Sequence, residues 1–172
     1  DTKCFGTLSP DEFANGAAEA VKTSVLDGEE LFSMLETGDL ANRIDEIVAR
    51  CVAFKVRVVE LDETEAGLRK TLNLGHTAAH AIEKCSGYAM PHGHAVAIGL
   101  AIIARAAERL GWAEEPAAAR ILAALQQNGL PVTTDFAPEE LVSAARLDNE
   151  RAGGKITLVV PRRIGACERI DI

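Results

Sequence analysis

Apolar residues recur at steps of three and four along most of this chain, which is the pattern of amphipathic helices. A first helix is predicted over residues 10–28. Ser9 can cap its amino end, Pro10 suits the first helical position, and Glu12 completes a capping pattern. A short second helix is predicted over residues 29–36, where a threonine, a glycine and an aspartate then interrupt the pattern.

The next stretch, residues 40–61, contains neither glycine nor proline and predicts a long helix. Its apolar stripe consists of Ile44, Ile47, Val48, Cys51, Val52, Val58 and Val59. Lys55 falls on the same stripe, where a leucine or a valine would be expected. Two interpretations stay open for it: a lysine that reaches out from the edge of the stripe, or a buried ammonium that faces an anion.

Three of the four histidines lie within residues 73–92. Asn73 can cap a helix that carries His76 and His80 and ends near residue 87. The two histidines are four residues apart, so they share one face of that helix. Neutral imidazole is a good ligand for zinc-like metals, although such a pair also arises by chance. The residues alone thus offer His76 and His80 as a possible metal pair.

His92 opens the next predicted helix, which runs to about residue 110. It stands four residues before Val96 and therefore begins the buried face of that helix. Two interpretations are open here too: a histidine whose hydrogen bonds are satisfied in the first helical turn, or a ligand that points into the domain.

In the last third of the chain the predicted helices are followed by predicted strands. Helices are predicted over residues 115–127 and 138–146, followed by a β-branched strand over 155–160, a turn, and a second strand over 167–172. The expected class is mainly α, a multi-helical domain with a small β-hairpin near its C-terminus. We expect one domain over residues 1–172, because this length suits a single core.

The composition of the chain limits the kinds of partner that it can bind. Hydrophobic residues make up 48% of the chain, enough for a core, and aromatic residues only 4%. The net charge of −8 argues against non-specific binding to nucleic acid and against an anionic membrane surface. The four cysteines are scattered and form no CxxC pair, which favours free thiols in a reducing cytoplasm. We see no signal peptide and no apolar run of membrane-spanning length.

Several segments resemble the 3-dehydroquinate synthase family, within the sugar phosphate cyclases. They are ELDETEAGLRKTLNLGHTAAHAIE with the following HGHAVAIGL, the early AAEAVKTSVLDGEELFSMLE, and the late LDNERAGGKITLVVPRRIG. The combination NxGHTxxHAxE plus HGxAVxxG is far more specific than HxxxH alone. The resemblance covers nearly the whole chain but matches only the C-terminal half of the family. We therefore expect a dehydroquinate-synthase-like metal- and substrate-binding domain without the NAD-binding half.

The resemblance implies a divalent metal, zinc or cobalt, held by Glu19, His76 and His92. Two imidazoles and one carboxylate leave coordination positions open, as in catalytic zinc sites. The residue pattern alone would not select Glu19, since it lies with Lys22 on the polar side of its helix. The resemblance also separates His76 from His80, which is left to face the substrate.

The resemblance further implies the substrate 3-deoxy-D-arabino-heptulosonate 7-phosphate, a small phosphorylated sugar acid of the shikimate pathway, which leads to the aromatic amino acids. The implied substrate-binding positions are Lys22, Lys55, Arg69, Asn73 and His80. Of these, Lys22 and His80 are expected to take part in catalysis. The implied lyase reaction combines metal-assisted transient oxidation by NAD, elimination of phosphate and aldol ring closure. The full-length enzyme is expected to be a homodimer, and this chain alone to be inactive.

Three positions depart from the family pattern. The family's Asp-Lys-Lys run is Asp148-Asn149-Glu150, which removes positive charge where phosphate should lie; Arg151 and Lys155 are the nearby cations. The family's HGE is HGH, so that His94 replaces a carboxylate, and we expect a surface histidine in the first helical turn. The family's KYG is KTS, beginning at Lys22.

These departures keep three alternatives open. The first is another sugar phosphate cyclase. The second is the metal domain of an iron-type alcohol or glycerol dehydrogenase. The cations Lys22, Lys55 and Arg69 argue against it, because they favour an anionic substrate over a plain alcohol. The third is a helical domain that has lost its function, against which the complete set of metal ligands argues.

Overall fold

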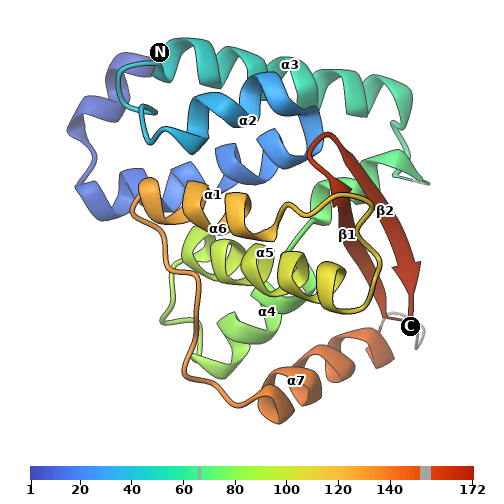
Figure 1. Ribbon diagram of the computed structural model, residues 1–172. Coiled ribbons are helices and arrows are strands. Elements are labelled where there is room, and N and C mark those ends of the chain that lie inside the picture. Colours follow the sequence, from blue (N-terminus) through green and yellow to red (C-terminus); the bar gives the residue numbers. More distant parts are fainter. Residues whose placement is uncertain (66, 152–155) are drawn as a thin grey trace.

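Helices make up most of the fold, and one β-hairpin completes it (Figure 1). The computed structural model describes residues 1–65, 67–151 and 156–172, except for the side chains of residues 148–151. In chain order the elements are η1 (Thr2–Thr7), α1 (Pro10–Asp27), α2 (Glu29–Glu36), α3 (Ile44–Leu61), η2 (Leu68–Asn73), α4 (His76–Cys85), α5 (His92–Arg109), α6 (Ala118–Gln127), α7 (Pro138–Arg151), β1 (Thr157–Arg163) and β2 (Ala166–Asp171). The expected class, mainly α with a small hairpin, is confirmed.

The central helix is α5, which packs against α1, α4, α6 and β1. Its side chains are buried on nearly every face, because neighbours surround it. Glycine allows the close contact between α5 and α4: a Cβ atom on Gly99 would lie 2.2 Å from the carbonyl oxygen of Gly75. Helix α4 can therefore begin directly against α5.

Helix α1 supplies the second buried surface of the core. The predicted cap is present, since the Ser9 hydroxyl accepts a hydrogen bond from the Glu12 N–H at 3.2 Å. Buried residues continue around its C-terminal half and include Lys22, which is only 3% exposed. The prediction that Lys22 lies on the polar side of this helix is therefore wrong: α5 and η2 also pack against α1, so the helix lacks a fully solvated face.

Helix α3 differs from its prediction in its start and in its burial. Residues 40–43 form a turn, in which the Arg43 N–H donates to the Asp39 and Leu40 carbonyls, and the helix begins at Ile44. Of the predicted apolar stripe only Ile47 and Val58 are buried. The helix lies at the margin of the molecule (Figure 1), so that most of this stripe is only partly buried and Val52 is 54% exposed.

The cap predicted for the histidine-bearing helix is wrong. Asn73 ends the 3-10 helix η2, and Gly75, with φ of 78°, precedes His76 as the N-cap of α4. A positive φ suits glycine best, and it turns the chain from η2 into α4. Helix α6 starts at Ala118, three residues later than predicted, while α7 runs on to Arg151.

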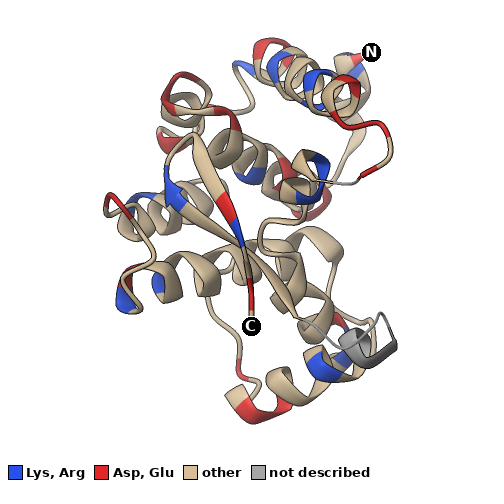
Figure 2. Cartoon of the chain, turned by 90° about the vertical axis from the view of Figure 1, so that its right-hand side faces the viewer, with Lys and Arg blue, Asp and Glu red and all other residues tan. Residues whose placement is uncertain are grey.

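The hairpin pairs β1 with β2 in antiparallel register, with an irregularity between Pro161 and Arg163. Both strands are shifted by one to three residues from their prediction, because pairing continues through Pro161. At its tip the Gly165 N–H donates to the Val25 carbonyl at 2.9 Å, which joins the hairpin to α1. Lysine, arginine and acidic residues alternate over the outer helices (Figure 2). Among the described residues, no helix is long and apolar enough to cross a bilayer.

Candidate metal centre

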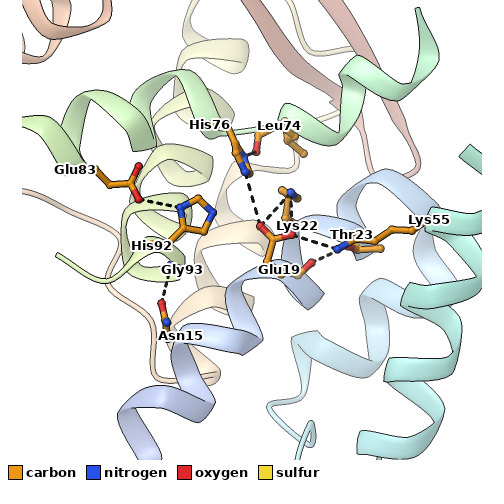
Figure 3. A network of polar contacts seen from close by, with 10 residues as sticks. All are labelled: Asn15, Glu19, Lys22, Thr23, Lys55, Leu74, His76, Glu83, His92 and Gly93. Carbon is orange, nitrogen blue, oxygen red and sulfur yellow. Dashed lines mark hydrogen bonds and ion pairs between the residues drawn. The ribbon is translucent and has the colours of Figure 1, made fainter. Parts of the chain in front are cut away.

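Three potential metal ligands come together from three helices. Glu19 lies on α1, His76 is the first residue of α4, and His92 is the first residue of α5. One ligand atom from each lies within 4.8 Å of the other two. The imidazole rings of His76 and His92 are 5.4 Å apart between centroids, and His76 Nε2 lies 3.9 Å from Glu19 Oε1 (Figure 3).

Helix packing explains this convergence. The Asn15 side-chain oxygen accepts a hydrogen bond of 2.6 Å from the Gly93 N–H, which fixes the start of α5 on α1. A Cβ atom on Gly93 would lie 1.9 Å from the Asn15 carbonyl oxygen, so this approach depends on glycine. Asn15 stands one turn before Glu19 on α1, and Gly93 follows His92. The contact therefore places His92 beside Glu19.

Hydrogen bonds leave the same nitrogen of each imidazole available. His76 Nδ1 lies 3.2 Å from the Leu74 carbonyl oxygen, and His92 Nδ1 lies 2.9 Å from Glu83 Oε1. A carbonyl and a carboxylate can only accept, so each Nδ1 carries the proton and each neutral ring keeps its lone pair on Nε2. Two such nitrogens and a carboxylate fit a zinc-like divalent ion with open coordination positions.

His76 is suited to this role at neutral pH. Its side chain is 15% exposed. Burial, together with the charge of Lys22, lowers the pKa of His76 to about 4, against the opposing effects of the Leu74 carbonyl and Glu19. The ring is therefore neutral near pH 7, and no proton has to leave before a metal ion binds.

Two lysines surround the carboxylate of Glu19. Lys22 Nζ lies 3.0 Å from Glu19 Oε2, and Lys55 Nζ lies 3.5 Å from the same oxygen (Figure 3). Burial raises the pKa of Glu19, but Lys22 and Lys55 outweigh it and hold the pKa below its usual value. Burial lowers the pKa of Lys22 against the opposing effect of Glu19. Lys55 faces an anion, as one interpretation expected, yet 46% of its side chain is exposed.

The remaining predicted substrate positions lie around this cluster or beyond it. His80 is exposed, one turn along α4, with its ring centroid 5.7 Å from that of His76. Asn73 is exposed at the end of η2. Arg69 lies near the start of the same 3-10 helix, where its guanidinium donates to the Glu63 carbonyl at 3.0 Å and its backbone N–H to Asp62.

The positions that depart from the family pattern lie in different structural environments. The side chains of residues 148–151, and Lys155, lie outside the described residues. The prediction of a surface role for His94 is wrong: its side chain is 17% exposed because α1 covers it, and Nε2 lies 3.6 Å from Asp11. Thr23 is buried, and its hydroxyl donates to the Glu19 carbonyl at 2.7 Å. It thus steadies the helical turn that carries Glu19.

The sequence analysis gave no role to two residues that touch this cluster, Asn15 and Glu83. Glu83 is the last residue of the motif NxGHTxxHAxE, seven residues after His76 and therefore on the same face of α4, and that position could have suggested a role. Asn15 gave no signal, because its partner is a backbone N–H that is 78 residues away in sequence.

Comparison with known proteins identifies the family. Residues 16–151 match the family model described as 3-dehydroquinate synthase C-terminal. The chain belongs to this family. Among curated 3-dehydroquinate synthases, that of Dehalococcoides mccartyi is 37% identical and that of Pyrococcus furiosus 40% identical, each over 96% of this chain. The matched part is 48% and 50% of those proteins, so the chain spans about half their length.

Solved structures support the dehydroquinate synthase fold. A 2-epi-5-epi-valiolone synthase from Streptomyces hygroscopicus, with NAD+ and Zn2+ bound, matches with a TM-score of 0.86 and 24% identity, over 99% of this chain and 50% of its own. A 2-deoxy-scyllo-inosose synthase, complexed with carbaglucose-6-phosphate, NAD+ and Co2+, matches with a TM-score of 0.77 and 21% identity, over 98% of this chain and 49% of its own. At these identities the likeness concerns the fold.

Proposed function

We propose that residues 1–172 form the metal- and substrate-binding domain of a 3-dehydroquinate synthase. The enzyme would convert 3-deoxy-D-arabino-heptulosonate 7-phosphate into 3-dehydroquinate and phosphate, in the shikimate pathway. NAD would come from the other half of the full-length enzyme, which we expect to be a homodimer. The observation that carries the proposal is the convergence of Glu19, His76 and His92 from three helices.

The three ligands would hold a zinc or cobalt ion in an open, catalytic coordination. Such an ion supplies Lewis-acid stabilisation of negative charge on a substrate oxygen. His76 and His92 offer Nε2 while their Nδ1 atoms are hydrogen-bonded, and Glu19 offers a carboxylate. The carboxylate also offsets part of the charge of the ion.

The lysines provide the preference for an anion. Lys22 is almost fully buried and Lys55 half-exposed, and both ammonium groups lie against Glu19. With a divalent ion at Glu19, this region carries excess positive charge, which suits a substrate with a carboxylate and a phosphate. We assign Lys22 and Lys55 to substrate binding, with Lys22 also close enough to the ligands to hold a proton during catalysis. His80, Asn73 and Arg69 are assigned to the surrounding substrate contacts, His80 also to proton transfer.

Metal analysis tests the site. The purified chain is dialysed against zinc and the bound metal measured by mass spectrometry. We expect about one ion per chain, and loss of most of it in Glu19→Gln, His76→Ala and His92→Ala. His80→Ala is the matched control, because it removes a neighbouring imidazole on the same helix, and it should retain the ion. Stoichiometric zinc in all of the first three variants would refute the proposed ligands.

Calorimetric titration tests the substrate class. The zinc-loaded chain should bind 3-deoxy-D-arabino-heptulosonate 7-phosphate, and removal of zinc or Lys55→Ala should weaken binding by about tenfold or more. Preference for another cyclic sugar phosphate would instead favour a different cyclase, and binding of glycerol alone would favour a dehydrogenase. We expect no release of phosphate by this chain with added NAD and zinc. Measurable turnover would contradict the need for a second domain.

A further inference from the structure

Glu83 is an acidic residue next to the metal centre that is neither a proposed metal ligand nor a proposed substrate contact. It lies in the last turns of α4, on the face that carries His76. Its Oε1 atom is 2.9 Å from His92 Nδ1, and its side chain is only 16% exposed (Figure 3). The other ring nitrogen of His92 lies on the side toward Glu19 and His76.

The backbone of Glu83 is firmly held. Its carbonyl oxygen accepts hydrogen bonds from the Tyr88 N–H at 2.7 Å and from the Ser86 hydroxyl at 2.8 Å. The same hydroxyl accepts from the Met90 N–H at 3.3 Å. The connection from α4 to α5 is therefore built around Glu83, and it ends at His92. This arrangement fixes the carboxylate relative to the imidazole.

The imidazole of His92 needs such a partner more than that of His76 does. The side chain of His92 is 49% exposed, whereas that of His76 is 15% exposed and is tied to the Leu74 carbonyl. A half-exposed ring without a partner at Nδ1 can turn over or place its proton on Nε2, and in either case the lone pair no longer faces the other ligands. A carboxylate at Nδ1 prevents both changes.

Helix stability does not explain this acid. A carboxylate in the last turn of a helix meets the negative end of the helix dipole, where a cation is favoured. Partial burial adds a cost of desolvation. A carboxylate that accepts from the second nitrogen of a metal-binding histidine is, however, a common feature of zinc sites.

We propose that Glu83 is a positioning residue that fixes the ring and the tautomer of His92 so that Nε2 faces Glu19 and His76. The inference rests on the proposed metal-binding function, because His92 is its target. Glu83 itself contacts neither metal nor substrate. Its removal should weaken metal binding while the three ligands stay in place.

Zinc affinity, measured by competition with a chelator of known affinity, is the first readout. We expect Glu83→Ala to weaken zinc binding by about 10- to 100-fold, and Glu83→Gln, which keeps an acceptor oxygen, to weaken it less. The absorption spectrum of the Co2+-loaded chain should change in Glu83→Ala. Glu60→Gln is the matched control: Glu60 is an exposed acid near the C-terminal end of α3, and its variant should bind zinc as the unmodified chain does.

The tautomer of His92 is the second readout, and it needs no metal. Long-range ¹H–¹⁵N correlation spectra of the metal-free chain should show His92 protonated on Nδ1, and a shift toward Nε2–H in Glu83→Ala. Zinc affinity and tautomer both equal to those of Glu60→Gln would overturn the role of Glu83. If the unmodified chain binds no zinc, the proposed function fails, and the tautomer alone then decides: Nδ1–H lost in Glu83→Ala supports positioning, and no change refutes it.

Discussion

His76 is the residue whose ionisation is most altered by the fold. Burial and the ammonium of Lys22 lower its pKa to about 4, from an ordinary value of about 6.5. Because the folded pKa lies below the unfolded one, the unfolded chain binds the proton first as pH falls. The free energy of unfolding should therefore decrease between pH 6.5 and pH 4, by about 3 kcal/mol from this group, and this contribution should be constant above and below that window.

Urea unfolding of the metal-free chain at several pH values measures this effect. His76→Gln should remove the part of the decrease in unfolding free energy that comes from His76. The difference between the unmodified chain and this variant therefore measures the contribution of His76. A chelator is needed throughout, since bound metal would stabilise the folded state on its own. Equal slopes for both chains between pH 6.5 and pH 4 would show that burial of His76 does not disfavour its protonation.

Glu19 and Lys22 form a second test at the same scale. The side chain of Lys22 is 4% exposed and that of Glu19 32%. Glu19→Ala leaves a buried ammonium whose main counter-charge is gone, which should destabilise the metal-free chain by roughly 2 to 4 kcal/mol. The double variant Glu19→Ala with Lys22→Met should recover most of that loss, because no uncompensated charge remains. Additive losses in a double-mutant cycle would contradict a coupled pair.

Individual residues also show which parts of the site could be predicted from the sequence. The resemblance selected Glu19, His76 and His92, and these three come together; spacing alone would have paired His76 with His80. Burial of Lys22 was not predictable from helical periodicity, because the periodicity reports one apolar face and α1 is covered on more than one. Contacts to backbone atoms, such as that of Asn15, leave no trace in side-chain pattern.

At the scale of elements, glycine decides how closely helices approach. Gly93→Ala would place a Cβ atom 1.9 Å from the Asn15 carbonyl oxygen, so α1 and α5 would have to separate. We expect a loss of about 2 kcal/mol or more in unfolding free energy and weaker zinc binding, because His92 moves away from Glu19.

Gly16→Ala is the matched control, on α1 itself. A Cβ atom there meets nothing within 4 Å, and alanine is the better helix former. This variant should stabilise the chain by about 0.5 to 1 kcal/mol in the same urea experiment. If both variants behaved alike, the close contact between α1 and α5 would not limit the fold.

The elements themselves were largely predictable, and their boundaries were not. Caps and breakers located α1, α2 and the hairpin, since Ser9, Pro10 and Gly165 act locally. The predicted start of α4 was wrong because asparagine often caps helices, which favoured Asn73. The actual cap is Gly75, whose positive φ is a property of the backbone and is not visible in the residue pattern. The stripe on α3 predicted burial, but a stripe gives no information on whether a neighbour covers it.

At the scale of the molecule, the cysteines report on opening of the fold. Burial raises the pKa of the Cys51 thiol to about 11 and that of Cys167 to about 12, while Cys4 is exposed. With a thiol reagent at pH 7.5, Cys4 should react first, and the partly buried Cys51 and Cys167 more slowly, at a rate that rises as the structure opens. Mass spectrometry of digested samples locates the label, and Cys4→Ser should abolish the fast phase. Early labelling of Cys167 would show that the hairpin separates from the core without global unfolding.

The burial of Lys22 against Glu19 also has a thermodynamic consequence. A metal ion bound to the Glu19 carboxylate would weaken the ion pair of Lys22 with Glu19, its acidic partner among the described residues. The Lys22 ammonium would then favour binding of another anion. Metal and anion should then each raise the affinity for the other by the same factor, because coupling between two binding equilibria is reciprocal. With Lys22 paired to a metal-binding Glu19, the chain would hold its metal most tightly while an anion is bound.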